Sequence, residues 1–88
     1  MNDSLDGFLQ EPPHRYEFEV VMRGYARRPV RDLFDRVEKT LNGTADELER
    51  VSPDVVRAAT FDVVLRGYRR EQVHAALLDC VQRLQAQG

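Results

Sequence analysis

Two near-copies of one short stretch decide the fold: VVMRGYARRPV at residues 20–30 and VVLRGYRREQV at residues 63–73. A shift of 43 residues aligns them and extends the match to residues 18–41 against 61–84, where nine of 24 positions are identical. Such self-similarity is typical of an internal duplication. Two copies are too few for a solenoid, so the sequence predicts one small pseudo-twofold domain.

Each copy combines an extended segment, a tip and a helix. The Phe-acid-Val-Val segments that begin at Phe18 and Phe61 are β-branched and favour short strands. Glycine then allows the chain to turn without steric cost. We therefore expect a turn at each tip, made by Gly24, Tyr25, Gly67 and Tyr68. Immediately before each turn stands an apolar residue, Met22 or Leu65, followed by Arg23 or Arg66.

Apolar residues recur with helical spacing after each tip, which predicts amphipathic helices at 27–41 and 69–86. Pro29 suits the first turn of its helix, and Asn42-Gly43 is a stop signal. Two of the apolar positions, Phe34 and Leu77, are equivalent in the alignment and are expected at the centre of the core. The predicted core is Val30, Phe34, Val37, Leu41, Val73, Leu77, Cys80 and Leu84.

The linker between the copies contains two helix signals. A capping-box pattern at residues 44–47 and the Ser52-Pro53 pair predict short helices near 45–51 and 53–59. If the two long helices run parallel, the linker must retrace about 22 Å, and its helical length suffices. The predicted fold class is therefore mainly α, with two short extended segments. Residues 1–15 form a flexible lead-in, and 16–88 form one domain made of repeats 18–41 and 61–84.

Charge is distributed unevenly although the net charge is only −2. Near the two tips lies a basic cluster, consisting of Arg27, Arg28, Arg31, Arg69 and Arg70 in addition to the two tip arginines. These side chains form either a solvated face or a contact for an anionic membrane or an acidic partner. Nucleic acid binding is not favoured, because the chain has no strongly basic total and no recognition helix.

The residue types needed for catalysis or metal binding do not occur in suitable patterns. His14, His74 and Cys80 lack the spacing of a zinc site, and no phosphate-binding glycine loop or catalytic triad is present. The sequence therefore predicts no enzyme, no metal and no cofactor. A single cysteine favours a reducing cytoplasm, and no apolar run is long enough to span a bilayer.

Phe61 through Val73, preceded by Ser52-Pro53-Asp54-Val55-Val56-Arg57, resembles the N-terminal domain of the DivIVA-like family of bacterial division and polarity scaffolds. The copy that begins at Phe18 matches only from that residue onward. Where the family usually has Asp after Tyr, this chain has Ala26 and Arg69. The family's long coiled coil has no counterpart in the 88 residues.

The resemblance implies a cytoplasmic scaffold that is a parallel dimer with crossed tip loops, whose apolar-Arg pairs touch the inner membrane leaflet. Carried over by position, those pairs are Met22-Arg23 and Leu65-Arg66. We therefore expect a protein-interaction module in cell division or polar organisation, with a protein partner or a second copy and peripheral membrane contact. The alternative is a soluble adaptor without membrane affinity, which binds a longer family member or an unrelated partner.

Overall fold

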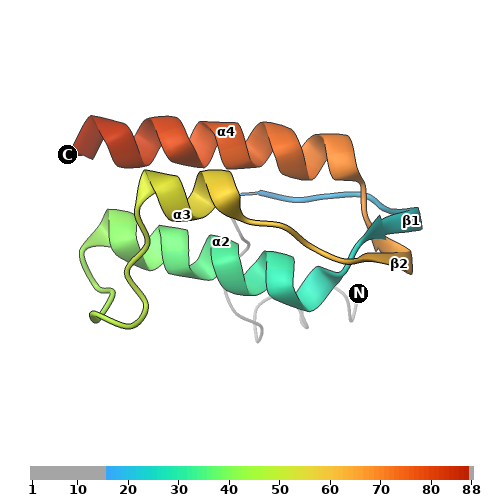
Figure 1. The fold of residues 1–88 in the computed structure, drawn as a ribbon, viewed down its shortest axis with the longest axis horizontal. Coiled ribbons are helices and arrows are strands. Elements are labelled where there is room, and N and C mark those ends of the chain that lie inside the picture. The colour runs from blue at the N-terminus through green and yellow to red at the C-terminus, as the bar shows by residue number, and fades with distance from the viewer. Residues whose placement is uncertain (1–15, 88) are drawn as a thin grey trace, which may run out of the picture.

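The computed structural model of the protein describes residues 16–87, so the predicted lead-in at residues 1–15 lies outside the described part of the chain. Within that part the element order is strand β1 (Val20–Tyr25), helix α2 (Arg27–Asn42), helix α3 (Pro53–Ala58), strand β2 (Val63–Tyr68) and helix α4 (Arg70–Gln87). The strands lie together at one end of the molecule, and the helices extend away from them (Figure 1).

The predicted fold class, a mainly α duplicated domain, is wrong. Residues 16–87 are 56% helical, with three helices, and the two extended segments pair to form a two-stranded antiparallel sheet. Each strand also includes the Arg-Gly-Tyr that was expected to turn. The reason is local chemistry: two valines and a tyrosine favour the extended backbone, and each segment provides the other with a hydrogen-bonding partner.

The strand register shows the antiparallel direction. As β1 runs from Val20 to Tyr25, its partners in β2 run backwards from Tyr68 to Val63. Hydrogen bonds continue the pairing at both ends: Ala26 N–H donates to the Asp62 carbonyl and Arg69 N–H to the Glu19 carbonyl, both at 2.9 Å. The pairing therefore extends over residues 19–26 and 62–69.

The structure places Gly24 and Gly67 inside the strands instead of at a turn. Neither has a left-handed backbone, whereas Arg23, the residue before Gly24, has φ 62°. Both glycines are buried. Because glycine has no side chain, the two backbones can approach each other closely at these positions. The glycines are not there to change the direction of the chain.

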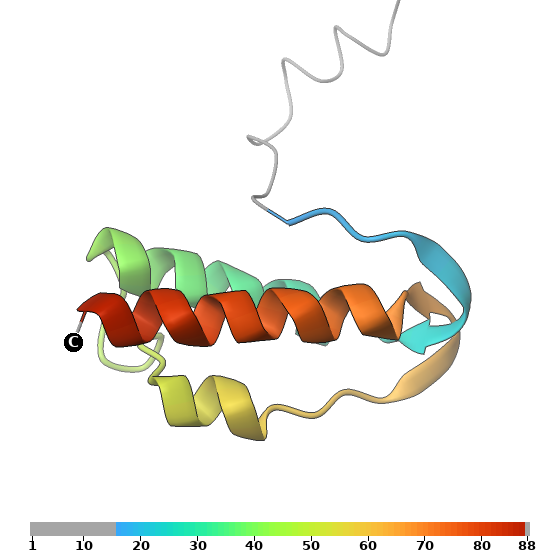
Figure 2. The same cartoon turned by 90° about the horizontal axis from the view of Figure 1, so that it is seen from above.

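Helices α2 and α4 both start at the sheet and run in the same direction (Figure 1). Their far ends are joined where Gln87 Nε2 donates to the Leu41 carbonyl at 2.8 Å. The parallel packing considered from the linker length is therefore observed. Seen from above, α4 lies between α2 on one side and α3 on the other (Figure 2).

Three predicted helix boundaries are confirmed. Pro29 lies in the first turn of α2, and Gly43 ends that helix with φ 77°, the left-handed cap that glycine adopts most easily. Helix α3 begins at Pro53, and the Ser52 hydroxyl accepts a hydrogen bond from the Val55 N–H at 3.3 Å.

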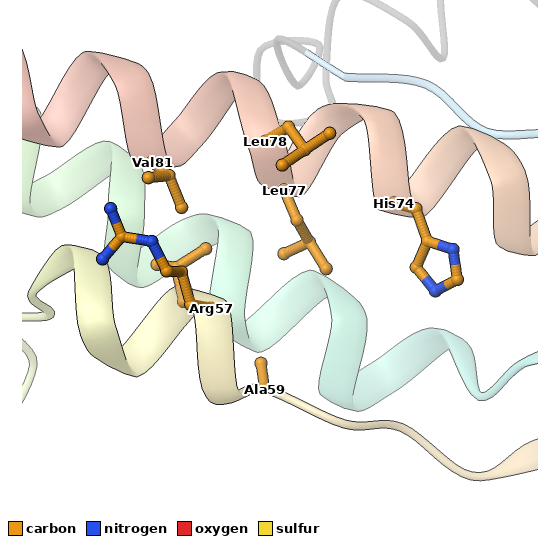
Figure 3. Close-up of a pocket in the computed structure, with 7 residues that line it drawn as sticks. Arg57, Ala59, His74, Leu77, Leu78 and Val81 are labelled. Atoms are coloured by element: carbon orange, nitrogen blue, oxygen red, sulfur yellow. The ribbon is translucent and has the colours of Figure 1, made fainter.

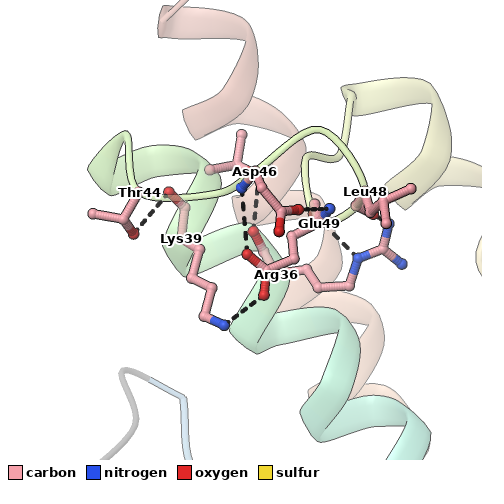
Figure 4. Close-up of polar contacts among 7 residues, drawn as sticks. Arg36, Lys39, Thr44, Asp46, Leu48 and Glu49 are labelled. Atoms are coloured by element: carbon pink, nitrogen blue, oxygen red, sulfur yellow. Dashed lines mark hydrogen bonds and ion pairs between the residues drawn. The ribbon is translucent and has the colours of Figure 1, made fainter.

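The helix predicted near 45–51 does not form; residues 47–49 make a single turn. Asp46 Oδ1 accepts from the Glu49 N–H at 2.9 Å, and Lys39 Nζ lies 2.7 Å from Glu49 Oε2 (Figure 4). The Val51 N–H donates to the Thr40 hydroxyl at 3.1 Å instead of to the Glu47 carbonyl, which a helix at 45–51 would use. Leu48 is 89% exposed, so a helix here would have no apolar face to bury.

The core lies where the three helices meet the sheet. Of the predicted core residues, Val30, Phe34, Val37, Val73, Cys80 and Leu84 are buried, whereas Leu41 and Leu77 are only partly buried. The remaining buried apolar residues are Leu33, Val51, Val56, Tyr68, Ala76 and Val81. Ala76 thus takes the central position in α4 that was expected for Leu77. The small side chain at that point lets α4 lie close to its neighbours.

Candidate functional site

The strand end of the molecule exposes large apolar side chains. Met22 is 68% exposed and Leu65 is 67% exposed, one on each strand of the paired sheet. Val20, Val63 and Val64 on the same strands are partly exposed as well. An uncovered apolar surface at this end of the molecule is a candidate contact site.

Arginines flank these apolar side chains. In the strand register Met22 lies opposite Arg66, and both Arg23 and Arg66 are exposed. The structure therefore brings together the four residues that were singled out as two separate pairs. We call Met22, Arg23, Leu65 and Arg66 the tip.

Aromatic side chains brace the tip on the helices. Tyr68 is buried and its ring lies 5.2 Å from that of Phe18, while the Tyr25 ring lies 5.5 Å from that of Phe61. The Tyr25 hydroxyl is also hydrogen-bonded to Nε2 of exposed His74 at 2.6 Å. The tyrosine that ends each strand thus packs on the phenylalanine that precedes the other strand. This arrangement fixes the tip relative to α2 and α4.

The predicted basic cluster does not act as one unit. Arg69 forms an ion pair with Glu19 at 2.6 Å, and Arg70 is exposed at the start of α4. One open hollow of about 630 Å³ beside β2 is lined by Arg27, Arg28, Arg31 and Arg66, but not by Arg23. This hollow, which we call the basic depression, is lined by Ala26, Arg27, Arg28, Pro29, Arg31, Val64, Arg66 and Tyr68.

A second hollow lies between α3 and α4 and is mostly apolar (Figure 3). It measures about 490 Å³ and is lined by Val56, Arg57, Ala59, His74, Leu77, Leu78 and Val81. Leu78 is 66% exposed. The sequence pattern does not predict this hollow, although Leu78 lies outside the predicted apolar stripe of its helix. That position was the one signal that could have revealed it.

Chemistry at Cys80 is suppressed by its surroundings. The side chain is fully buried, and this burial raises the pKa of the Cys80 thiol to about 11. The thiol is therefore protonated at neutral pH and is a poor nucleophile or metal ligand. Across residues 16–87, no three His, Cys, Asp or Glu side chains gather in a way that could hold a metal ion.

Nearby, the Tyr16 hydroxyl donates a hydrogen bond to Asp79 Oδ2, which also accepts from Arg83 Nε at 2.8 Å. Burial and then this hydrogen bond raise the pKa of the Tyr16 phenol above its ordinary value. The contact ties the segment before β1 to the middle of α4. It is structural, because both polar partners are satisfied within the fold.

No protein-family model, curated protein or solved structure matched the chain in our comparisons. The resemblance to the DivIVA-like family therefore stays a prediction. None of the helices in the described part of the chain is both long and apolar enough to cross a membrane.

Proposed function

We propose that this chain is a non-enzymatic interaction module that contacts an anionic membrane peripherally, through Met22 and Leu65 with Arg23 and Arg66 beside them. The single observation that carries the proposal is that two large apolar side chains, each about two-thirds exposed, project from the same braced sheet. The resemblance stated above suggests the setting: a DivIVA-like role in bacterial cell division or polar organisation, at the cytoplasmic face of the inner membrane.

Magnitudes indicate weak binding by one molecule. Full burial of a side chain such as Met22 or Leu65 in hydrocarbon contributes about 1.5–3 kcal/mol. Each arginine near an anionic leaflet adds about 1 kcal/mol, and the carboxylate of Asp62 close by subtracts from this. The sum corresponds to a dissociation constant of order millimolar to tens of micromolar. Stable attachment therefore needs several copies on one surface.

The test is co-sedimentation of the chain with phosphatidylglycerol vesicles, compared with vesicles of phosphatidylcholine alone. We expect the Met22→Ser plus Leu65→Ser variant to fold normally, because both side chains are exposed, and to lose binding to the anionic vesicles. Leu48→Ser is the control, since Leu48 is also an exposed apolar side chain, at 89%, but lies in the linker. Equal binding by the tip variant and the control would refute the membrane contact.

A second candidate function is an adaptor that binds a protein partner and has no membrane affinity. The apolar hollow between α3 and α4, with exposed Leu78 at its edge, favours this candidate. Folded wild-type protein that never sediments with vesicles of either composition would support it. A collapsed melting temperature in the Met22→Ser plus Leu65→Ser variant would also support it, because the two side chains would then be part of the core.

A further inference from the structure

The basic depression concentrates positive charge. Four of its lining residues are arginines, and among residues 16–87 no carboxylate lines it. Arg27, Arg28 and Arg66 are exposed, and within residues 16–87 none of the three forms an ion pair. Such a group of unpaired guanidinium groups repels itself, and an anion placed among them relieves this repulsion.

The fourth arginine, Arg31, is held in a fixed orientation. Its Nε donates to the Tyr68 hydroxyl at 2.8 Å, and its guanidinium carbon lies 5.2 Å from the centre of the Tyr68 ring. Nη1 also reaches the Tyr16 carbonyl at 3.4 Å. Because the Tyr68 hydroxyl accepts from Arg31, its own proton remains available to donate. The depression therefore offers a prearranged hydrogen-bond donor beside flexible cationic side chains.

The corresponding positions after β2 lack this character. The four positions that align with Arg27, Arg28, Pro29 and Arg31 are Arg70, Glu71, Gln72 and His74. There Glu71 offsets Arg70, the Gln72 amide oxygen accepts from the Glu19 N–H at 2.7 Å, and Arg69 pairs with Glu19. The excess positive charge thus belongs to one side of the sheet and is not a general property of the surface.

From these observations we propose that the basic depression is a binding site for a phosphate group, a phosphomonoester or a phosphodiester. Guanidinium groups match phosphate oxygens in planar, two-point geometry, and several of them around one hollow suit a group with several acceptor oxygens. Two sources share this chemistry: the headgroup of an anionic lipid and a soluble phosphate compound. The lipid source rests on the membrane contact proposed above, whereas the site itself does not.

The position of the depression fits the lipid source. Val64 and Arg66 line it, and Met22 lies opposite Arg66 in the strand register. A headgroup phosphate in the depression would therefore lie next to the side chain that we propose enters the hydrocarbon. The site would select lipids with a phosphate headgroup. Met22 and Leu65 alone would enter the hydrocarbon of any lipid.

The experiment compares Arg27→Gln plus Arg28→Gln with a control that loses the same charge elsewhere, Arg50→Gln plus Arg70→Gln. All four side chains are exposed, so both variants should keep the wild-type melting curve. Pyrophosphate is titrated into each protein and followed by amide chemical shifts, and phosphatidylglycerol vesicles are tested by co-sedimentation. At about 1 kcal/mol for each arginine, we expect the first variant to lose about 25-fold in affinity.

Loss of pyrophosphate binding in the first variant, with shifts confined to residues 26–31 and Tyr68, supports a site for soluble phosphate. Loss for vesicles alone supports the lipid headgroup. An equal loss in both variants, or no loss in either, would overturn the site. The Met22→Ser plus Leu65→Ser variant separates the two proposals, because it should still bind pyrophosphate even if the membrane contact is lost.

Discussion

The backbones of Gly24 and Gly67 touch where β1 and β2 cross. A Cβ added to Gly24 would lie 2.4 Å from the carbonyl carbon and oxygen of Gly67, and one added to Gly67 would lie 2.2 Å from the Tyr25 carbonyl oxygen. The neighbouring atoms belong to the backbone, so they cannot rotate away as a side chain would. Glycine is therefore required at both positions for the strands to pair.

Replacing either glycine by alanine should disrupt the sheet. We expect Gly24→Ala and Gly67→Ala each to reduce the free energy of unfolding by about 3 kcal/mol or more, because the added methyl group overlaps backbone atoms. The control is Gly43→Ala: Gly43 has a left-handed backbone but no atom within 4 Å of its missing Cβ. That change should cost about 1 kcal/mol. Urea denaturation of the three variants checks the order.

Phe34 and Leu77 occupy aligned positions in the sequence but differ in burial. Phe34 is 5% exposed and packs against the rings of Tyr16 and Phe18, so Phe34→Ala should cost about 3–5 kcal/mol. Leu77 is only partly buried, and Leu77→Ala should cost about 1–2 kcal/mol. Leu78→Ala serves as the exposed control, within about 0.5 kcal/mol of wild type. Equal costs for Phe34 and Leu77 would contradict the observed burial.

Thr40 joins α2 to the segment that leads into α3. Its hydroxyl donates to the Arg36 carbonyl at 2.8 Å and accepts from the Val51 N–H at 3.1 Å. Thr40→Val keeps the shape but leaves the Val51 N–H without its partner, which should cost about 1–3 kcal/mol. Thr44→Val is the matched control, since that exposed hydroxyl makes only a 3.5 Å contact with the Lys39 carbonyl. Thermal unfolding that gives equal losses for both would argue against this role.

Stability should fall in alkaline solution because of Cys80. Burial raises the pKa of its thiol from 9.0 to about 11, so the folded chain keeps a proton that the unfolded chain has released. The resulting stabilisation is complete below about pH 9 and is lost as the pH rises through about 11. Urea titrations across this range should show a shallower decline for Cys80→Val. Tyr16→Phe should also reduce the slope, because the raised pKa of Tyr16 acts in the same direction.

Helix signals in the sequence were reliable where local chemistry alone decides the backbone. Proline in a first turn, serine before Pro53 and glycine after Asn42 each act within one turn of helix, and the structure has all three boundaries. The signal at residues 44–47 failed because side chains from α2 compete for it. The Thr40 hydroxyl accepts the Val51 N–H, which a helix at 45–51 would use, and this long-range contact is not visible in a capping pattern.

The pairing of the two strands could not be predicted from local preference. The repeated pattern Val-Val-apolar-Arg-Gly-Tyr predicts a strand followed by a turn, because glycine is common where a chain reverses. The crossing of two backbones instead requires glycine for its small size. Only knowledge that both copies meet in space distinguishes the two uses. The exposure of Met22 and Leu65 depends on the same crossing. So does the placement of Arg31 and Arg66 in the basic depression, apart from Arg69, which pairs with Glu19.

The antiparallel sheet joins segments from the two halves of the described chain, and this has a kinetic consequence. Neither strand can find its partner until α2, the linker and α3 have brought the halves together, and closing so long a loop carries an entropic cost. Contacts between distant segments form slowly, so the sheet should assemble last during folding and open first. The surface that carries Met22 and Leu65 would then exist only in a completely folded molecule. Partial products and fragments of either half would not display it.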